Sequence, residues 1–494
     1  MTTEEETPPL RIGRLPERGG DMLAARPSRW FPLVALFLAV QVGPWWYTSP
    51  DSSCYLSIAR SFSRDDGPRN LGNRFLFYPP GYPLLLAPTF AFGDRPFAAI
   101  GMVQWSAALL LAAGLYRWAR PLGATAAMFT AMLSCGHSAF AIYYRRPLSE
   151  IAFMATMVWC ALVLDRVRTS TAARTRWAAA IGGTLLLAAA CQIRPNGILL
   201  APGFATALVV QAWRDGRGMR RALLVGGVVG FAAAAVFLAG RTLDDARAAV
   251  DRGVTYWDYL TKIQPTGGTL LDRAVEGVRI QMLEFLRLVV PGMLKTHVRA
   301  EGWTNANTLL SIVVSLPVVA GWRRLAVVRG DVLAWTAPFF IGLNVLWSAD
   351  QGGRYTLPML PVIAASLWLL GESLRLPMRR LALPIIAVHA TLALGYWLTI
   401  DLPRTRAANA HWPTIDALAE RIDRDRDRVA VQNFGTDEVN LLRLTLDRQV
   451  YDWDLDAAAG RVEIRWLLSS LETALPADFE PVAEIGPFRL ARRS

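Results

Sequence analysis

The stretch Arg29–Asp51, RWFPLVALFLAVQVGPWWYTSPD, joins an apolar run to an acid that follows it directly. The run from Arg29 to Thr48 is long enough to cross a bilayer, since about 20 mostly apolar residues span the hydrocarbon core. Pro50 and the serines beside it predict that one helix ends here and that Asp51 caps the next helix. An acid held at the water edge of a membrane could act on a substrate that is carried by a lipid.

The whole chain has the composition of a multi-pass membrane protein. It contains 494 residues, 53% of them hydrophobic, and its mean hydropathy of +0.28 is more than an ordinary soluble domain needs. The formal net charge is +12, but nearly all the cations are Arg residues grouped in short segments between apolar runs, which argues against a nucleic-acid partner. The four cysteines show neither a disulfide framework nor the spacing of a zinc site.

Apolar runs of roughly 17 to 22 residues predict about eleven membrane-spanning helices. With the N-terminus in the cytoplasm, Arg is concentrated in the predicted inside segments and scarce in the short outside loops, as the positive-inside rule requires. The first run lacks a cleavage site and is therefore expected to be an anchor. The runs lie near residues 30–48, 97–117, 122–142, 150–165, 177–192, 197–213, 221–240, 304–321, 332–348, 355–371 and 381–400.

This orientation divides the chain into a basic cytoplasmic tail, a transmembrane domain and an extracytoplasmic domain. In the first long loop, Leu84 to Phe92 form an apolar stretch too short to span, which predicts a juxtamembrane helix. The predicted fold is mainly α: a polytopic transmembrane helix bundle with extracytoplasmic juxtamembrane helices and a small C-terminal α/β domain. The parts are residues 1–28, residues 29–400 with extracytoplasmic loops at about 49–96 and 241–303, and residues 401–494.

The α/β character of the C-terminal domain follows from a change in pattern after Asp401. Alternating residues predict short strands, and one amphipathic segment predicts a helix between two of them. The strands are expected at 428–433, 449–454 and 462–469, and the helix at 437–446.

Two acids at the predicted outer face could carry chemistry. Asp51 follows the first span, and Glu150 opens the fourth. An alternative for Asp51 is that it only caps a helix from Ser52 to Ser63. An acid at the lip of an apolar helix is costly unless it has a partner or a task, so Glu150 at the same face favours a shared site.

Several basic side chains reach the same predicted level, where they could bind an anionic headgroup. Guanidinium groups match phosphate oxygens, although interfacial anchoring is the alternative for each of them. Arg354 follows two glycines between two spans, whereas Arg194 lies in a tight turn that any helical hairpin needs. The group comprises Arg145, Arg146, Arg194, Arg354, Lys295 and His297.

Aromatic residues near Asp51 could stack on a sugar ring or line the path of a lipid. Tyr55, Tyr78 and Tyr82 are the candidates for this role. Trp45 and Trp46 are more simply explained as interfacial anchors, because Trp collects at membrane surfaces without any substrate.

Five motifs, in their order along the chain, resemble the GT-C superfamily of integral membrane glycosyltransferases, and in particular the protein O-mannosyltransferases and lipid A aminoarabinose transferases. The resemblance covers roughly residues 30–400 and leaves the C-terminal domain uncovered. The motifs are Asp51 after the first membrane helix, YPPGYPLLLAP at 78–88, RPLSEIAF at 146–153, RPNG at 194–197 and RYTLPMLP at 354–361.

The resemblance implies transfer of a sugar from a polyprenyl-phosphate donor to an acceptor hydroxyl at the outer face of a bacterial inner membrane, with inversion at the anomeric carbon. By position, Asp51 matches the first-loop acid of the family, which acts as general base, and Glu150 matches its second acidic position, usually Asp. Arg145, Lys295 and Arg354 would contact the donor phosphate. The acceptor, whether glycan, lipid or protein, is not identified.

The same resemblance implies no firm cofactor, although two acids could hold a divalent metal ion. Tyr55, Tyr82 and Arg194 are the expected substrate contacts.

Two other functions stay open at this point. A transporter or flippase would also have many spans, but transporters tend to place polar residues at mid-bilayer and to show repeated halves. The predicted spans here are rich in Ala, Leu and Val instead. A lipid-linked glycan ligase or polymerase would differ mainly in the size of the donor.

Overall fold

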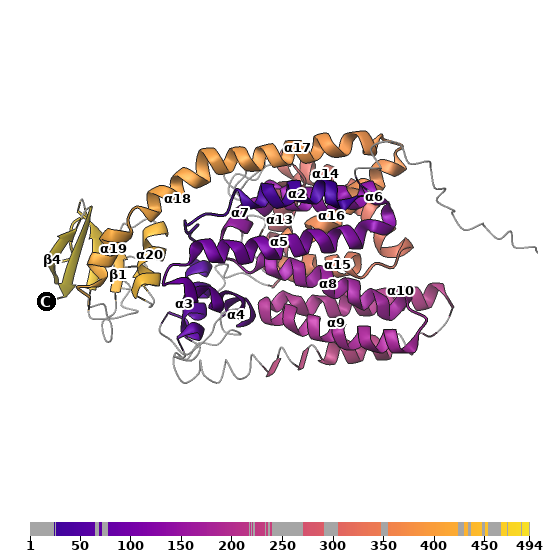
Figure 1. Cartoon of the computed structure of the whole chain (residues 1–494), viewed down its shortest axis with the longest axis horizontal. Coiled ribbons are helices and arrows are strands. Elements are labelled where there is room, and N and C mark those ends of the chain that lie inside the picture. The colour runs from indigo at the N-terminus through magenta and orange to yellow at the C-terminus, as the bar shows by residue number, and fades with distance from the viewer. Residues whose placement is uncertain are drawn as a thin grey trace, which may run out of the picture.

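A long bundle of helices ends in a small α/β domain in the computed structural model of the chain (Figure 1). The predicted fold class, a mainly α bundle with a small C-terminal α/β domain, is confirmed. The structure describes residues 24, 26–64, 69–71, 78–216, 218, 220, 223–232, 234–235, 238–239, 270–290, 305–346, 354–422, 429–432, 436–446, 450–452, 466–471, 473–485 and 487–493.

The bundle is built from α-helices with short 3-10 or π segments between or after them. Up to residue 214 these are α2 (Pro27–Ala39), α3 (Pro50–Ser63), α4 (Gly81–Leu86), η1 (Ala87–Phe92), α5 (Phe97–Ala119), η2 (Arg120–Leu122), α6 (Ala124–Gly136), α7 (Ser138–Arg145), α8 (Glu150–Thr169), α9 (Ala173–Ile193), η3 (Pro195–Leu199) and α10 (Leu200–Arg214). From residue 270 they are α13 (Leu270–Val289), α14 (Asn305–Arg323), η5 (Arg324–Val328), α15 (Val332–Leu346), η6 (Leu357–Met359), α16 (Leu360–Ser373), α17 (Met378–Tyr396) and η7 (Trp397–Asp401).

Each of the eleven predicted spans overlaps at least one helix in the described part of the chain. Among the described residues, five helices are long and apolar enough to cross a membrane, and a sixth is added if the bent pair α6 and α7 forms one span. Others, such as α15 and α16, are apolar but shorter. The helices are those expected of a multi-pass membrane protein, while the number of spans stays a prediction.

Two of the predicted spans are not continuous helices. α2 ends at Ala39, well before Thr48, because Gly43 and Pro44 do not favour continuation of a helix. The run at 122–142 bends by 53° between α6 and α7, where His137 has an extended backbone.

The predicted juxtamembrane helix is present as α4 followed by η1. Its apolar residues Leu84, Leu85 and Phe92 are exposed by 51%, 47% and 80%. A short helix with an exposed apolar face fits a position along a membrane surface.

Arg-rich connections that the sequence assigns to one side of the membrane lie together in the structure. The Arg168 guanidinium donates to the carbonyl of Arg329 at 3.1 Å, and that of Arg214 donates to the carbonyl of Val328 at 2.6 Å. The segments after α8, α10 and η5 therefore meet at one end of the bundle.

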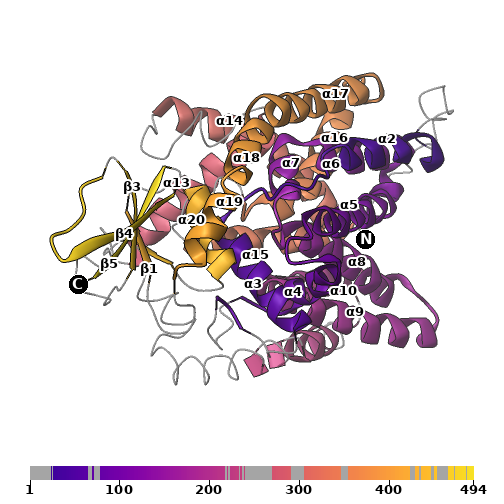
Figure 2. The same cartoon turned by 60° about the vertical axis from the view of Figure 1, so that its left-hand side comes forward.

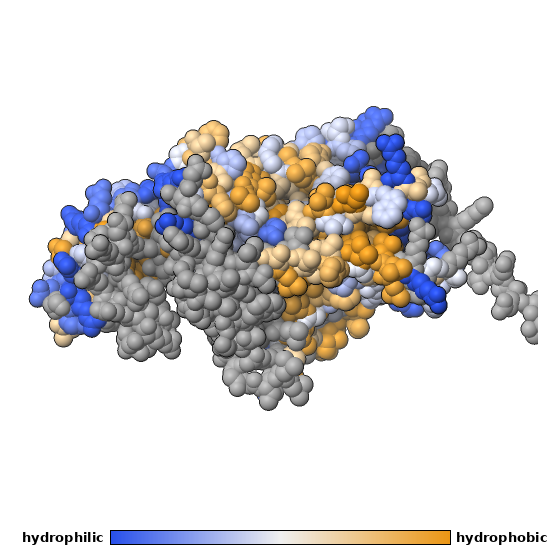
Figure 3. Space-filling view, turned by 90° about the horizontal axis from the view of Figure 1, so that it is seen from below, coloured by the Kyte–Doolittle hydropathy of each residue, from blue (hydrophilic) through white to orange (hydrophobic). Residues whose placement is uncertain are grey.

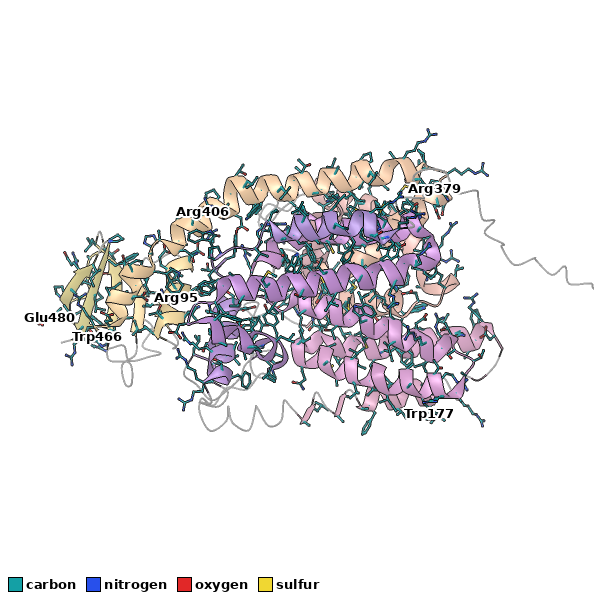
Figure 4. The ribbon with its side chains drawn as sticks, viewed as in Figure 1. Arg95, Trp177, Arg379, Arg406, Trp466 and Glu480 are labelled. Carbon is teal, nitrogen blue, oxygen red and sulfur yellow. The ribbon has the colours of Figure 1, made fainter. Side chains whose placement is uncertain are left out.

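Hydrophobic side chains cover the bundle between its two ends. Figure 3 shows them over the helices, with hydrophilic residues gathered on the C-terminal domain and at the far end. Figure 4 places Arg379 at that far end, and Arg95 and Arg406 beside the C-terminal domain. Residues predicted to lie on opposite sides of the membrane thus lie at opposite ends, and the direction of insertion stays a prediction.

The C-terminal domain is a five-stranded mixed sheet with strand order β2-β1-β3-β5-β4. β1 pairs in parallel with β2 and β3, and β5 pairs antiparallel with β3 and β4. α20 crosses over between the parallel strands β1 and β2, as such a pair requires. The elements are α18 (Leu402–Asn409), α19 (Trp412–Ala419), β1 (Val429–Gln432), α20 (Thr436–Leu446), β2 (Val450–Asp452), β3 (Trp466–Ser470), β4 (Phe479–Ile485) and β5 (Phe488–Arg493).

All three predicted strands and the predicted helix of this domain correspond to β1, β2, β3 and α20. The strands β4 and β5 were not predicted. They complete the sheet on the antiparallel side of β3.

Candidate active site

Asp51 is placed by the cap of α3. The Ser49 hydroxyl accepts from the Ser52 amide at 3.2 Å, and the Ser52 hydroxyl accepts from the Ser49 amide at 2.9 Å. This reciprocal box satisfies two N–H groups at the helix start, and Pro50 suits the first helical position. The expectation that Asp51 caps the helix is therefore wrong. Its carboxylate is available for other contacts, and 26% of the side chain is exposed.

The Arg354 guanidinium bridges the two predicted acids. Its Nη1 donates to Asp51 Oδ2, and its Nε donates to Glu150 Oε1. Arg194 Nη1 lies 2.6 Å from the same oxygen of Glu150. Burial by itself would lower the pKa of Arg354, but the carboxylates of Glu150 and Asp51 raise it well above its ordinary value. Asp51, Glu150, Arg194 and Arg354 are termed the Asp51 cluster.

The two acids of the Asp51 cluster differ in accessibility. The Glu150 side chain is fully buried, whereas 26% of the Asp51 side chain is exposed. Glu150 is balanced by two guanidinium groups, as a buried carboxylate must be. Of these two acids, only Asp51 is open to solvent, while Glu150 pairs with both guanidinium groups.

Two tight approaches of the backbone bring Arg194 to this position. A Cβ atom on Gly197, the last residue of RPNG and part of η3, would lie 2.6 Å from the carbonyl carbon of Ala190. A Cβ atom on Gly81, at the start of α4, would lie 2.6 Å from the carbonyl oxygen of Gln192. Only glycine fits at these two sites. The segments YPPG and RPNG thus meet at the end of α9.

Three tyrosines form a connected group that reaches the Asp51 carboxylate through Tyr78. The Tyr78 hydroxyl donates to Asp51 Oδ1 at 2.7 Å. Burial, together with Asp51, raises the pKa of Tyr78 well above its ordinary value, so Tyr78 stays a protonated donor. The Tyr55 ring lies 4.8 Å from that of Tyr78 and 5.1 Å from that of Tyr82.

Tyr55 and Tyr82 are only 3% and 0% exposed, so they form a packed support behind Asp51. The Tyr55 hydroxyl lies 3.1 Å from Ser149 Oγ, next to Glu150, and the Tyr82 hydroxyl accepts from Gln104 at 3.0 Å. Substrate contact by these two tyrosines stays a prediction.

Arg145 lies in a separate group. Its Nε and Nη2 are 2.9 and 2.7 Å from Asp401 Oδ2, and its Nη1 donates to Gln41 Oε1 at 2.8 Å. Arg145, Asp401 and Gln41 are termed the Arg145 cluster. The Arg145 side chain is fully buried there and does not join the Asp51 cluster.

The neighbouring Arg146 has 28% of its side chain exposed and lies 4.0 Å from Asp401. Of the other predicted phosphate contacts, Arg354 lies in the Asp51 cluster, and Lys295 lies outside the described residues.

A third acid near the site was missed in the sequence. Thr356 Oγ1 donates to Glu284 Oε2 at 3.1 Å, close along the chain to Arg354. Glu284 is fully buried on α13, which packs against α14 and α15. α13 lies within the segment 241–303, which was predicted to be a loop. The signal that could have found it is the alternation of apolar and charged residues along 270–289, which is typical of an amphipathic helix.

The two acids do not fit a divalent metal in this arrangement. Among the residues for which side chains are described, no group of three or more His, Cys, Asp or Glu lies together. Arg354 occupies the space between the carboxylates of Asp51 and Glu150 and supplies positive charge there.

Neither a family model nor a curated protein sequence matches this chain. Solved structures nevertheless share its fold. ArnT from Cupriavidus metallidurans bound to undecaprenyl phosphate matches with a TM-score of 0.60 and 15% identity, over 93% of this chain and 97% of ArnT. Its apo state gives a TM-score of 0.58 and 16% identity, over 93% and 96%. The Archaeoglobus fulgidus oligosaccharyltransferase, in complex with Zn and sulfate, gives 0.53 and 11% identity, over 90% of this chain and 68% of that one.

These matches show that the chain shares the fold of ArnT and of the oligosaccharyltransferase, as the resemblance predicts. At such low identity, they show the fold alone. The match with ArnT covers 93% of this chain, which is more than residues 1–400 alone could supply. It therefore includes much of the C-terminal domain. The expectation that the resemblance leaves this domain uncovered is therefore wrong.

Proposed function

We propose that this chain is a membrane glycosyltransferase that moves a sugar from a polyprenyl-phosphate donor to an acceptor hydroxyl, with Asp51 as general base. The observation that carries the proposal is the Asp51 cluster, in which a partly exposed carboxylate lies beside guanidinium groups held by a buried Glu150. The fold shared with ArnT, which binds undecaprenyl phosphate, supports the donor class. With the predicted orientation, the reaction occurs at the outer face of a bacterial inner membrane.

Arg354 and Arg194 supply the donor side of the reaction. A phosphate leaving group gains negative charge as the glycosidic bond breaks, and charge-assisted hydrogen bonds from guanidinium groups stabilise that charge. In this proposal the donor phosphate replaces Asp51 as a partner of Arg354, while Glu150 keeps its hold on the guanidinium. Lys295 is a further proposed phosphate contact, and Arg145 becomes one only if it leaves Asp401.

Asp51 supplies the acceptor side. Once Arg354 turns to the phosphate, Asp51 Oδ2 accepts the proton of the acceptor hydroxyl while the hydroxyl oxygen attacks the anomeric carbon. The bond from that carbon to the phosphate oxygen breaks, and polyprenyl phosphate leaves with the electron pair. This single displacement inverts the anomeric carbon. Tyr78 holds the other carboxylate oxygen at 2.7 Å and so keeps Asp51 oriented.

A lipid-linked glycan ligase is the second candidate, because the oligosaccharyltransferase shares the fold over 90% of this chain. The same cluster would then act on a lipid phosphate that carries a larger glycan. Donors with one sugar and with several sugars, assayed side by side, separate the two candidates.

The test follows sugar release from a radiolabelled polyprenyl-phosphate donor by the purified full chain, with a membrane lipid extract as acceptor. Asp51→Asn keeps the size of the side chain but removes the base, so we expect a rate about 10²- to 10⁴-fold lower. Asp94→Asn is the control, since Asp94 is an acid of the same loop whose side chain is 78% exposed. We expect this variant to keep the wild-type rate.

Full activity in Asp51→Asn would refute Asp51 as the base. Uptake of a solute into proteoliposomes that contain no lipid donor would instead favour a transporter.

A further inference from the structure

We infer that the C-terminal domain positions Asp51 by holding the helix that carries it, and that Arg60 is the positioning residue at the far end of this helix. The inference rests on the proposed role of Asp51. It concerns α3 and α20, which pack against each other between the bundle and the sheet (Figure 2).

α20 contacts α3 near both of its ends. Thr48, just before α3, donates its hydroxyl to Asp437 in the first turn of α20. Arg60, in the last turn of α3, donates from Nη2 to the carbonyl of Leu444 at 2.7 Å, near the end of α20. The two helices therefore run in the same direction, and α20 holds α3 near both of its ends.

The contact of Arg60 with Leu444 is of a strong kind. The last carbonyl groups of a helix have no partner within the helix, and a cation is favoured at the C-terminal end of the helix dipole. Arg60 is only 7% exposed, so water does not compete freely for this hydrogen bond. A charged donor also makes a stronger hydrogen bond than a neutral one.

A second set of contacts holds the segment that leads into α3. The side chain of Asn409, at the end of α18, accepts from the Trp46 amide at 3.1 Å and donates to the Trp46 carbonyl at 3.0 Å. Trp46 Nε1 donates to Ser52 Oγ at 3.2 Å, in the first turn of α3. The C-terminal domain thus reaches the cap that places Asp51.

Trp46 is also stacked between the two domains. Its ring lies 5.8 Å from that of Phe97 and 6.1 Å from that of Trp412, and only 1% of the residue is exposed. Interfacial anchoring is therefore the wrong explanation for Trp46, which serves as an interdomain residue.

α3 needs such support because it is short. It has 14 residues, and isolated helices of about 12 to 15 residues are marginal in water. Asp51 and Arg60 lie about 13 Å apart along the helix axis, at about 1.5 Å per residue. Arg60 therefore acts on catalysis only through the helix, and a displacement of about 1 Å at the base can cost about 10²-fold in rate.

The experiment measures hydrogen exchange of the α3 amides in the purified full chain in lipid nanodiscs. Arg60→Met is expected to speed exchange over residues 50–63 by about tenfold, because it removes a buried charged hydrogen bond. Arg95→Met is the matched control, since Arg95 also crosses to the C-terminal domain, through Asp416 and the ring of Trp412, but enters from the start of α5. It is expected to leave α3 exchange within about twofold of wild type, as a partly exposed pair contributes little.

Kinetics provide the second readout. Arg60→Met is expected to lower kcat about tenfold while the Kd for undecaprenyl phosphate is unchanged, and Arg60→Lys, which keeps a charged donor, is expected to recover most of the rate. Unchanged α3 exchange in Arg60→Met, or an equal rise in Arg95→Met, overturns the inference. If Arg60→Met does not fold, Thr48→Val tests the other end of α3, and unchanged exchange there overturns it too. The exchange measurement needs no substrate. A wild-type protein without activity would therefore refute the proposed transferase function but not the inference that α20 and Arg60 hold α3.

Discussion

The Asp51 cluster and the Arg145 cluster use the same chemistry in different surroundings. Each pairs guanidinium with carboxylate near the junction of the bundle and the C-terminal domain. In the first cluster, 26% of the Asp51 side chain is exposed, whereas in the second Arg145 is fully buried and Asp401 is 7% exposed. In a partly exposed ion pair, a substrate can replace one of the two side chains. A buried ion pair is closed to a substrate and connects parts of the fold. Burial, not residue type, therefore separates the candidate site from the structural link.

The Arg145 cluster connects three segments. Gln41 follows α2, Arg145 ends α7, and Asp401 ends η7, where the bundle passes into the C-terminal domain. Removing one partner of a buried ion pair leaves the other charge without compensation. The two clusters should therefore respond differently to substitution, the Arg145 cluster in stability and the Asp51 cluster in catalysis.

The largest expected change in stability is that of Arg145→Met. It should lower the free energy of unfolding by about 3 to 5 kcal/mol, because Asp401 is left buried without its main partner. Arg146, 4.0 Å from Asp401, favours the lower end of this range. The measurement is chemical unfolding in detergent micelles, with Arg404→Met as control. The Arg404 side chain is 66% exposed, so its loss should change little.

A double variant sharpens this prediction. Arg145→Met combined with Asp401→Leu removes both buried charges and should recover most of the lost stability. If Arg145→Met instead keeps full stability and loses binding of undecaprenyl phosphate, the donor-phosphate role predicted from the sequence would stand and the comparison of the two clusters would fail.

A smaller effect is expected for Arg354→Lys in the Asp51 cluster. An ammonium group lacks the planar fork that bridges two carboxylates, so the variant should bind undecaprenyl phosphate about tenfold more weakly or worse. The melting temperature should stay close to that of wild type, because the side chain keeps its charge. Binding is measured by titration of the lipid into the purified chain. Wild-type affinity in this variant would argue against Arg354 as a phosphate contact.

The smallest effect is expected for Tyr78→Phe. It removes one hydrogen bond to Asp51, worth about 1 kcal/mol, so kcat should fall about fivefold. Tyr116→Phe is the control, since the Tyr116 hydroxyl donates to the Ala24 carbonyl, near the start of α2. A kcat identical to that of wild type would show that Tyr78 does not support the base.

Much of the candidate site could be predicted from where residues stand relative to the apolar runs. Asp51, Glu150, Arg194 and Arg354 each border a span at the predicted outer face, and the structure brings all four together. Their pairing could not be predicted, because nothing local distinguishes Arg145 from Arg194. Each lies at the end of a helix, Arg145 before Arg146-Pro147 and Arg194 before Pro195. Arg145 nevertheless contacts Asp401, whereas Arg194 contacts Glu150.

Trp45 and Trp46 show the same limit. They are adjacent and chemically identical, but Trp45 is 36% exposed and Trp46 only 1%. The difference comes from Trp412 and Asn409, which belong to the C-terminal domain and lie far away in the sequence.

By itself, the sequence determined the fold class, the helical runs, the separation of the Arg-rich end and the α/β character of the C-terminal domain. These properties follow from hydrophobic pattern and charge distribution, which are local along the chain. Only the tertiary structure decided which cation faces which acid, what caps α3 and which residues join the two domains. Ion pairs and burial depend on neighbours that are distant in sequence. Those neighbours determine whether a charged side chain is exposed enough to contact a substrate.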